Sequence, residues 1–171
     1  MNPVLNSNCA ENNSNKTKCL FPEHLIPYIQ TPLFVTQTRF DTWQIINILG
    51  VEPNATYTSQ INGFGNILSE RATHSILSSD SKLKNALFLE SCAHHTNGYA
   101  STYIGDINIA NAFYLWYSPF LFANQLPLII MVVVDRYTNL TATRFWFQEA
   151  PFECKSCCSN YPNASSFTPN L

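Results

Sequence analysis

The stretch "TPLFVTQTRFDTWQIINILG", residues 31–50, contains the succession of elements that decides the fold. Residues 31–40 are rich in Phe, Val and Thr over the length of a strand, so we expect a buried strand there. Residues 41–50 then predict a short helix, with Asp41 near its start and Gly50 as its stop. The sequence therefore predicts a strand that leads directly into an acidic residue at the beginning of a helix.

The same order recurs further along the chain. Residues 61–77 carry apolar side chains at three- and four-residue steps, which predicts an amphipathic helix. The stretch "NALFLESCA", residues 85–93, predicts a second strand, and the adjacent His94 and His95 follow its end. Strands separated by helices indicate an α/β fold with a parallel sheet, in which reactive groups gather beyond the carboxyl ends of the strands. Asp41 and both histidines fall at that edge.

Two other segments are less regular. Residues 1–18 are expected to form a polar loop. Residues 107–134 hold no charged side chain and would be long enough to span a membrane, but the continuous apolar run in them, "LPLIIMVVV", is nine residues. We therefore expect a buried strand or hairpin in that segment, and no membrane association.

Composition limits the class of protein. The chain of 171 residues fits one domain, and its 46 % of apolar residues excludes a disordered polymer. Charged residues are 12 % of the chain, about half the usual share, and the net charge is −2. Because there is no basic stripe, we expect no nucleic-acid partner.

Cysteines and sequons indicate the compartment. The chain has six cysteines and five Asn-x-Ser/Thr sequons, which together favour a secreted, disulfide-bonded glycoprotein: Asn12, Asn15, Asn54, Asn139 and Asn163. Cys9 and Cys19 bracket a polar loop beside two of these sequons, so we predict that they pair. The first residues carry neither the basic nor the apolar region of a signal peptide, so we expect the natural protein to begin further upstream.

The adjacent histidines could be metal ligands, surface residues or part of a catalytic site. Cys154 and Cys157 have the C-x-x-C spacing of a zinc site, but in an oxidising compartment such thiols form disulfides. Adjacent histidines on an extended segment also point to opposite faces, so they could not easily share one ion. We therefore expect no metal and no cofactor.

A catalytic role would require the order Ser…Asp…His, as in α/β-hydrolases. Asp41 would orient the imidazole, and the histidine would act as base and then as acid. However, no Gly-x-Ser-x-Gly motif occurs anywhere in the chain. The residues alone therefore make catalysis only one of three alternatives.

Three blocks of sequence resemble the pectin acetylesterase family, which also contains the Notum-like carboxylesterases. "CLFPEHLIPYIQTPLFV", residues 19–35, resembles its Cys-aromatic-Phe-Pro segment, and "RFDTWQIINIL", residues 39–49, resembles its Tyr-Asp-Ser/Thr-Trp-Gln-Ile block. "FLESCAHHTN", residues 88–97, resembles its Asn-Ser-Cys-x-x-His block. "RFWFQEAPFECKSCC", residues 144–158, is a looser match to the end of the family's sequence.

The resemblance implies an α/β-hydrolase-like fold with a Ser-Asp-His triad. Asp41 matches the acid, and His95, three residues after Cys92, matches the histidine; a one-residue gap would select His94 instead. The family's serine block would lie upstream, so residues 1–171 would form a single partial domain, the C-terminal portion of an esterase. Its sheet would be incomplete, with residues 32–40 and 85–91 each lacking a hydrogen-bonded neighbouring strand on one side.

Other features of the chain depart from the family or have no match in it. Residues 104–135 would be an insertion. His24 and His74 have no motif support, and the pairing of Cys92, Cys154, Cys157 and Cys158 stays open. Phe40 and Trp43 are expected to pack in the core beside Asp41 rather than to contact a sugar.

The resemblance further implies a secreted serine esterase of the cell wall. Its substrate would be an acetylated polysaccharide, pectin or a related polymer, and it would use no metal or cofactor. Two alternatives remain: a Notum-like protein deacylase, or a catalytically inactive glycosylated surface protein.

Overall fold

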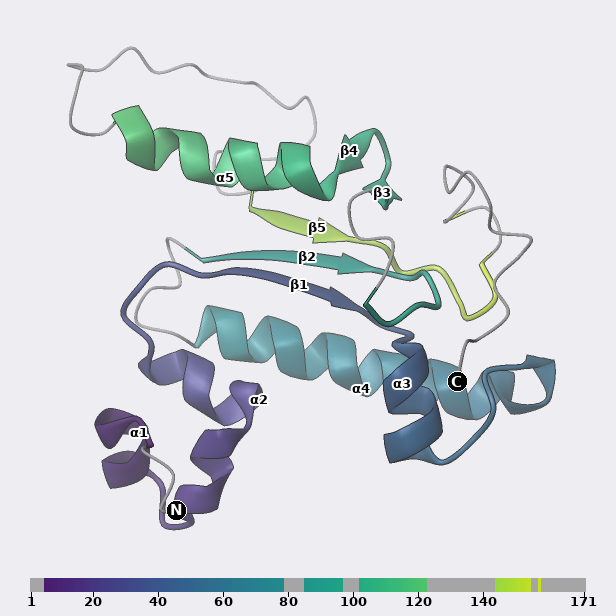
Figure 1. Cartoon of the computed structure of the whole chain (residues 1–171), viewed down its shortest axis with the longest axis horizontal. Helices are drawn as coiled ribbons and strands as arrows, with labels where there is room; N and C mark the ends of the chain where they lie inside the picture. Colours follow the sequence, from purple (N-terminus) through teal and green to yellow (C-terminus); the bar gives the residue numbers. More distant parts are fainter. Residues whose placement is uncertain (1–4, 79–84, 97–101, 123–143, 155–156, 158–171) are drawn as a thin grey trace.

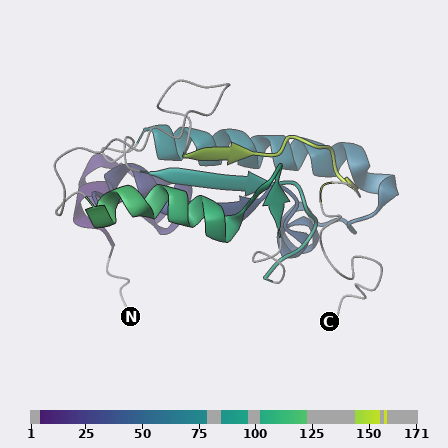
Figure 2. The ribbon, with the colours of Figure 1, turned by 90° about the horizontal axis from the view of Figure 1, so that it is seen from above.

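A three-stranded parallel sheet forms the centre of the molecule. The computed structural model describes residues 5–78, 85–96, 102–122, 144–154 and 157. Within this part the strand order is β1-β2-β5, with β1 at Phe34–Thr38, β2 at Ala86–Glu90 and β5 at Phe145–Phe147. Helices lie on both faces of the sheet, and the long helices run along the strand direction (Figures 1 and 2). The predicted α/β class with parallel strands is therefore confirmed.

One sheet face is covered by α4, Thr58–Leu77. This is the expected amphipathic helix, which begins three residues earlier than its apolar pattern. Its Ile76 packs against Leu87 and Leu89 of β2, in a core cluster that also includes partly buried side chains from the neighbouring elements: Ile26, Val35, Leu68, Ala72 and Phe145. All five residues of β2 are buried, which is the usual state of a central parallel strand.

The opposite face is covered by α5, Ile109–Phe122. Its buried Trp116 meets Phe34 of β1 with ring centroids 5.4 Å apart, and Phe34 lies 6.1 Å from Trp146 of β5. The prediction of a buried strand or hairpin is therefore wrong for residues 109–122. The Asn108 side chain accepts a hydrogen bond from the Asn111 backbone N–H (2.7 Å), and an asparagine at that position starts a helix.

A short antiparallel hairpin does precede this helix. It consists of β3, Tyr103–Ile104, and β4, Ile107–Asn108. Residues 123–134 lie outside the described residues. Across the described ranges, no helix combines the length and the apolar character needed to cross a membrane.

The N-terminal segment is helical where a polar loop was expected. It contains α1 (Ser7–Asn12), η1 (Lys16–Leu20), α2 (Pro22–Leu25) and η2 (Ile26–Tyr28). The abundant asparagines that suggested a loop act here as helix caps. Asn6 accepts from the Cys9 backbone N–H (3.0 Å), and Asn15 accepts from that of Thr17 (3.1 Å).

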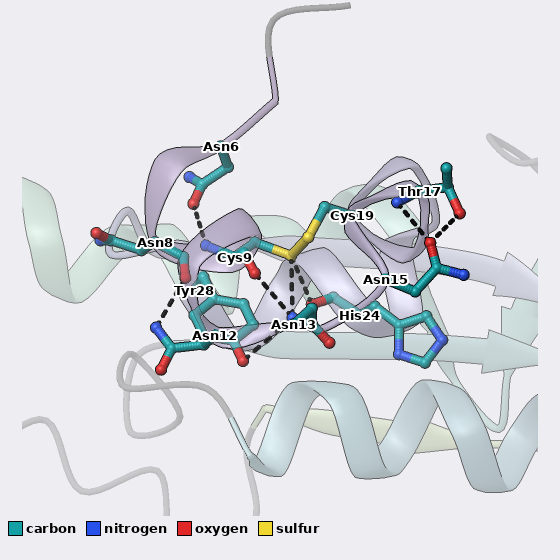
Figure 3. The surroundings of a disulfide bond; sticks show 10 residues. All are labelled: Asn6, Asn8, Cys9, Asn12, Asn13, Asn15, Thr17, Cys19, His24 and Tyr28. Atoms are coloured by element: carbon teal, nitrogen blue, oxygen red, sulfur yellow. Dashed lines mark hydrogen bonds between the residues drawn. A yellow bond between two sulfur atoms is a disulfide. The ribbon is translucent and has the colours of Figure 1, made fainter.

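The expected disulfide between Cys9 and Cys19 holds this segment together (Figure 3). The two Cα atoms are 5.9 Å apart, and the sequence separation of 10 gives a crosslink worth about 2–3 kcal/mol in restricting the unfolded chain. The Asn13 side-chain amide donates to the Cys9 carbonyl (2.9 Å) and to the Tyr28 hydroxyl (3.4 Å), so it ties α1 to η2.

The expected short helix follows β1. It begins as α3, Thr42–Gln44, continues as the π-helical η3, Ile45–Leu49, and ends at Gly50, whose φ of 76° is left-handed. A further short helix, η4 (Ala55–Tyr57), leads into α4. Beside η3, the buried Phe40, Ile45, Ile61 and Phe152 form a second core cluster, in which Phe40 meets Phe152 at 5.5 Å.

The end of β1 and α4 approach each other closely at Gly65. A Cβ atom built on Gly65 would lie 2.6 Å from Cε1 of Phe40 and 3.2 Å from the Arg39 carbonyl oxygen. A Cβ atom on Gly63, in the same helix, meets nothing within 4 Å. The position of Phe40, and of Asp41 after it, therefore depends on the missing side chain at Gly65.

We predict opposite effects for alanine at these two glycines. Gly65→Ala should lower the free energy of unfolding by about 1–3 kcal/mol because it overpacks the contact with Phe40. Gly63→Ala should raise it by up to about 1 kcal/mol, since alanine favours an exposed helix position. Urea denaturation of both variants measures the difference, and equal effects would contradict the close packing at Gly65.

Candidate active site

Hydrogen bonds connect the segments that follow the carboxyl ends of β1 and β2. The Arg39 backbone N–H donates to the Glu90 carbonyl (2.9 Å), and the Thr42 N–H donates to the His94 carbonyl (3.1 Å). The Thr38 hydroxyl also donates to the Cys92 carbonyl. These links hold the two segments side by side, so residues that are far apart in the sequence meet just beyond the sheet.

Asp41 is fixed as the N-cap of α3. Its Oδ1 accepts from the Gln44 backbone N–H (2.9 Å), and its own carbonyl accepts from that of Ile45 (2.9 Å). The residue is 4 % exposed. A carboxylate at a helix N-terminus is stabilised by the unpaired N–H groups there, so Asp41 is held in one orientation.

His95 lies directly against this carboxylate. Its Nδ1 is 2.9 Å from Oδ2 and 3.1 Å from Oδ1 of Asp41. A carboxylate can only accept, so Nδ1 is the donor, and this leaves Nε2 of a neutral ring as an acceptor. The His95 side chain is 46 % exposed, whereas that of Asp41 is 5 % exposed. The pair thus combines a buried acid with an accessible imidazole.

His94 has a different environment. It is buried, and its Nε2 lies 2.5 Å from Oε1 of the fully buried Glu90. The other oxygen of Glu90 accepts from the Cys92 backbone N–H (2.5 Å). His94 and Glu90 therefore fix the turn that carries His95. Of the two histidines, His95 is the one that contacts Asp41. The spacing from Cys92 had selected the same histidine.

Trp43 is not in the core, which corrects the sequence-based expectation. The residue is 50 % exposed. Its ring stacks on the His95 imidazole, with ring centroids 6.0 Å apart and ring planes at 25°. Ile45, two residues later in the same short helical segment, faces the core instead. Phe40 is fully buried, as expected.

Arg39 is a structural residue that the sequence analysis did not single out. Its guanidinium donates to the Ala150 carbonyl (3.0 Å) and to the Asn66 side chain (2.6 Å), so it joins the end of β1 to α4 and to the segment after β5. Burial lowers the pKa of Arg39, and the charge of Glu149 partly opposes this shift. Its place two residues before Asp41 was the available signal.

The remaining candidate residues lie elsewhere. Cys154 and Cys157 form a disulfide, Cα–Cα 5.4 Å, and Cys92 is also disulfide-bonded, whereas Cys158 lies outside the described residues. His24 contacts Glu23 (3.3 Å) and His74 contacts Ser78 (3.4 Å), both away from Asp41. Within the ranges that the structure describes, no group of three His, Cys, Asp or Glu side chains could hold a metal ion.

Three of the five sequon asparagines are in the described residues, and all three are exposed: Asn12, Asn15 and Asn54. The Asn54 side chain accepts from the Thr56 backbone N–H (3.0 Å) at the start of η4. Asn139 and Asn163 lie outside the described residues.

Comparison with known proteins gives one family. The sequence model of the pectinacetylesterase family matches residues 1–119. Pectin acetylesterase 7 of Arabidopsis thaliana is 32 % identical over 106 residues, and Pectin acetylesterase 11 of the same plant is 30 % identical over 106 residues. Each alignment covers 52 % of this chain and 26 % of the relative, so the chain spans about a quarter of these proteins. No solved structure matches the chain at a significant level.

The two histidines should differ in their effect on stability. His94→Ala should lower the free energy of unfolding by about 2–3 kcal/mol, because it leaves a buried carboxylate without its partner. His95→Ala should lower it by less than about 1 kcal/mol, since the hydrogen bond that it removes is partly exposed. Parallel urea titrations measure both values; a larger loss for His95→Ala would contradict the assigned environments.

Proposed function

Because the chain belongs to the pectinacetylesterase family, we propose that it is part of a serine esterase that removes acetyl groups from pectin or a related polysaccharide. The single observation that carries the proposal is the pair Asp41 and His95, with Nδ1 2.9 Å from the carboxylate, beyond two parallel strands. This edge is where α/β sheets present reactive groups. The fold that we propose for the whole protein is accordingly the α/β-hydrolase fold.

In the proposed mechanism a serine hydroxyl attacks the acetyl carbonyl carbon. Nε2 of His95 accepts the serine proton, and Asp41 stabilises the resulting imidazolium. His95 then donates this proton to the sugar oxygen, which leaves as an alcohol, and the acetyl group stays on the serine. Water, deprotonated by His95, attacks the acetyl-serine and releases acetate, and the serine recovers its proton.

The serine would be contributed by a part of the protein outside this chain. The sequence has no Gly-x-Ser-x-Gly motif, and the chain covers 26 % of each relative. We propose that residues 1–171 are a partial domain, that the remaining strands pair with the outer edge of β1, and that residues 104–135 are an insertion. The family match ends at residue 119, within that segment.

β2 already has strand neighbours on both sides, so the sheet can grow only beside its edge strands, β1 and β5. β2 pairs with β1 and with β5, so the expectation that residues 85–91 lack a neighbour is wrong; β5 was not foreseen as a partner. In the described part of the chain, β1 pairs with β2 alone. β1 and β5 are the two edge strands of this sheet in the described ranges, and we propose the open side of β1 as the place where the sheet grows.

We further propose that the protein is secreted to the cell wall and carries glycans. The Cys9–Cys19 and Cys154–Cys157 disulfides support an oxidising compartment, and three sequon asparagines are exposed. The alternative enzyme is a Notum-like protein deacylase. The alternative without enzymatic activity is an inactive surface protein.

The dyad can be tested in a chimera in which this chain replaces the matching segment of Pectin acetylesterase 7. Asp41→Asn and His95→Ala should each lower kcat for acetate release by roughly 10³–10⁶, because each removes a member of the proton-transfer pair. Acetate release from acetylated pectin measures the rates, and circular dichroism confirms folding.

His74→Ala is the matched control for that experiment, since His74 is an exposed histidine of the same chain. It should change the rate by no more than about twofold, as expected for a surface substitution. If Asp41→Asn and His95→Ala were as active as this control, the proposed roles would be refuted.

The chain by itself should be inactive. An esterase needs its nucleophile and oxyanion donors at fixed positions beside the base, and the described residues offer only an acid and a histidine. Purified residues 1–171 should release no acetate from acetylated pectin or phenyl acetate above background. Turnover that a serine-directed phosphonate abolishes would show that a serine of this chain is the nucleophile.

A further inference from the structure

We infer that Trp43 is the sugar-binding surface of this site, on which a pyranose ring of the polysaccharide stacks beside His95. The inference rests on the proposed function, and it adds a specificity-determining residue to the acid and the base. It starts from a contact that the reaction itself does not require: an exposed indole ring stacked on the imidazole, with the two ring planes at 25°.

The position of Trp43 is set by the same turn that fixes Asp41. Trp43 is the second residue of α3, whose first turn is capped by the Asp41 carboxylate. Its own carbonyl accepts from the Asn47 side-chain amide (2.8 Å), which reinforces the helix one turn later. The backbone that carries the indole is thus as well defined as the backbone that carries the acid.

Core packing does not account for this tryptophan. Trp43 is 50 % exposed, while Trp116 of α5 is 8 % exposed. An exposed indole leaves a large apolar surface in water, which is unfavourable unless a ligand or a partner covers it. The partly exposed Ile46, three residues further on, adds to the same apolar surface.

The chemistry of this surface suits a sugar ring. A pyranose has polar edges but a face of C–H groups, and these weakly positive hydrogens are attracted to the negative face of an aromatic ring. Because the imidazole stacks on the indole with centroids 6.0 Å apart, the proposed sugar would lie on the indole surface that His95 leaves open, one ring away from the imidazole. The indole N–H could donate a hydrogen bond to a ring hydroxyl or carboxylate.

A binding experiment on the chain itself tests this inference without any turnover. Three tryptophans, Trp43, Trp116 and Trp146, give three indole N–H resonances in a ¹⁵N-labelled sample, and Trp43→Phe identifies one of them. Titration with an acetylated oligogalacturonide should shift the Trp43 resonance and leave those of Trp116 and Trp146 in place, because Trp116 is buried and Trp146 is only partly exposed.

Three variants complete the binding measurement. Trp43→Ala should raise the Kd at least tenfold, and Trp43→Phe should raise it by less than threefold, because phenylalanine keeps an aromatic face. His74→Ala should leave the Kd unchanged. An unshifted Trp43 resonance, or an unchanged Kd in Trp43→Ala, would overturn the inference.

The chimera then separates sugar binding from other roles of the indole. Trp43→Ala should lower kcat/KM at least tenfold on acetylated pectin and by less than threefold on phenyl acetate. Equal losses on both substrates would mean that Trp43 only orients His95. With phenyl octanoate as a third substrate, a loss confined to this ester would indicate an acyl-chain site. Either result would overturn the inference. An inactive chimera whose Trp43 still binds the oligosaccharide would refute the esterase and support the sugar surface.

Discussion

The parallel pairing of β1 with β2 is the constraint on which the candidate site depends. In this register Thr38 is opposite Glu90, so the two strands end at the same level of the sheet. The segment after each strand then leaves the sheet immediately, and the Thr42 N–H donates to the His94 carbonyl. A one-residue slip of either strand would move Asp41 away from His95, because alternate residues of a strand point to opposite faces.

The two adjacent histidines differ in role at this edge: His94 stabilises the structure, and His95 would transfer protons. His94 points inward to Glu90, which also accepts from the Cys92 backbone N–H, so a buried pair shapes the turn. His95 points outward and keeps an accessible ring. Such an arrangement separates the polar group that stabilises the turn from the group that would transfer protons, and it explains why two histidines occur in succession.

The sequence predicted the elements with a strong local pattern, and the site followed from them. A clear local signature marks the strand, cap and helix around Asp41, and another marks the apolar spacing of α4. The carboxyl ends of the two predicted strands were therefore expected at one edge of the sheet. Long-range contacts had no such signature. In α5, Trp116 packs on Phe34, which also meets Trp146, and the exposed Trp43 stacks on His95. The asparagine-rich N-terminus suggested a loop because the same side chains cap helices and favour turns.

We propose that Asp41 holds His95 with its proton on Nδ1 and its lone pair on Nε2. Two-dimensional ¹⁵N–¹H NMR of the histidine ring, recorded under conditions where the imidazole is neutral, reports directly which nitrogen carries the proton. We expect the Nδ1–H tautomer for His95 in the unmodified chain and a shift toward the Nε2–H tautomer in Asp41→Asn. An Nε2–H tautomer in both proteins would contradict it.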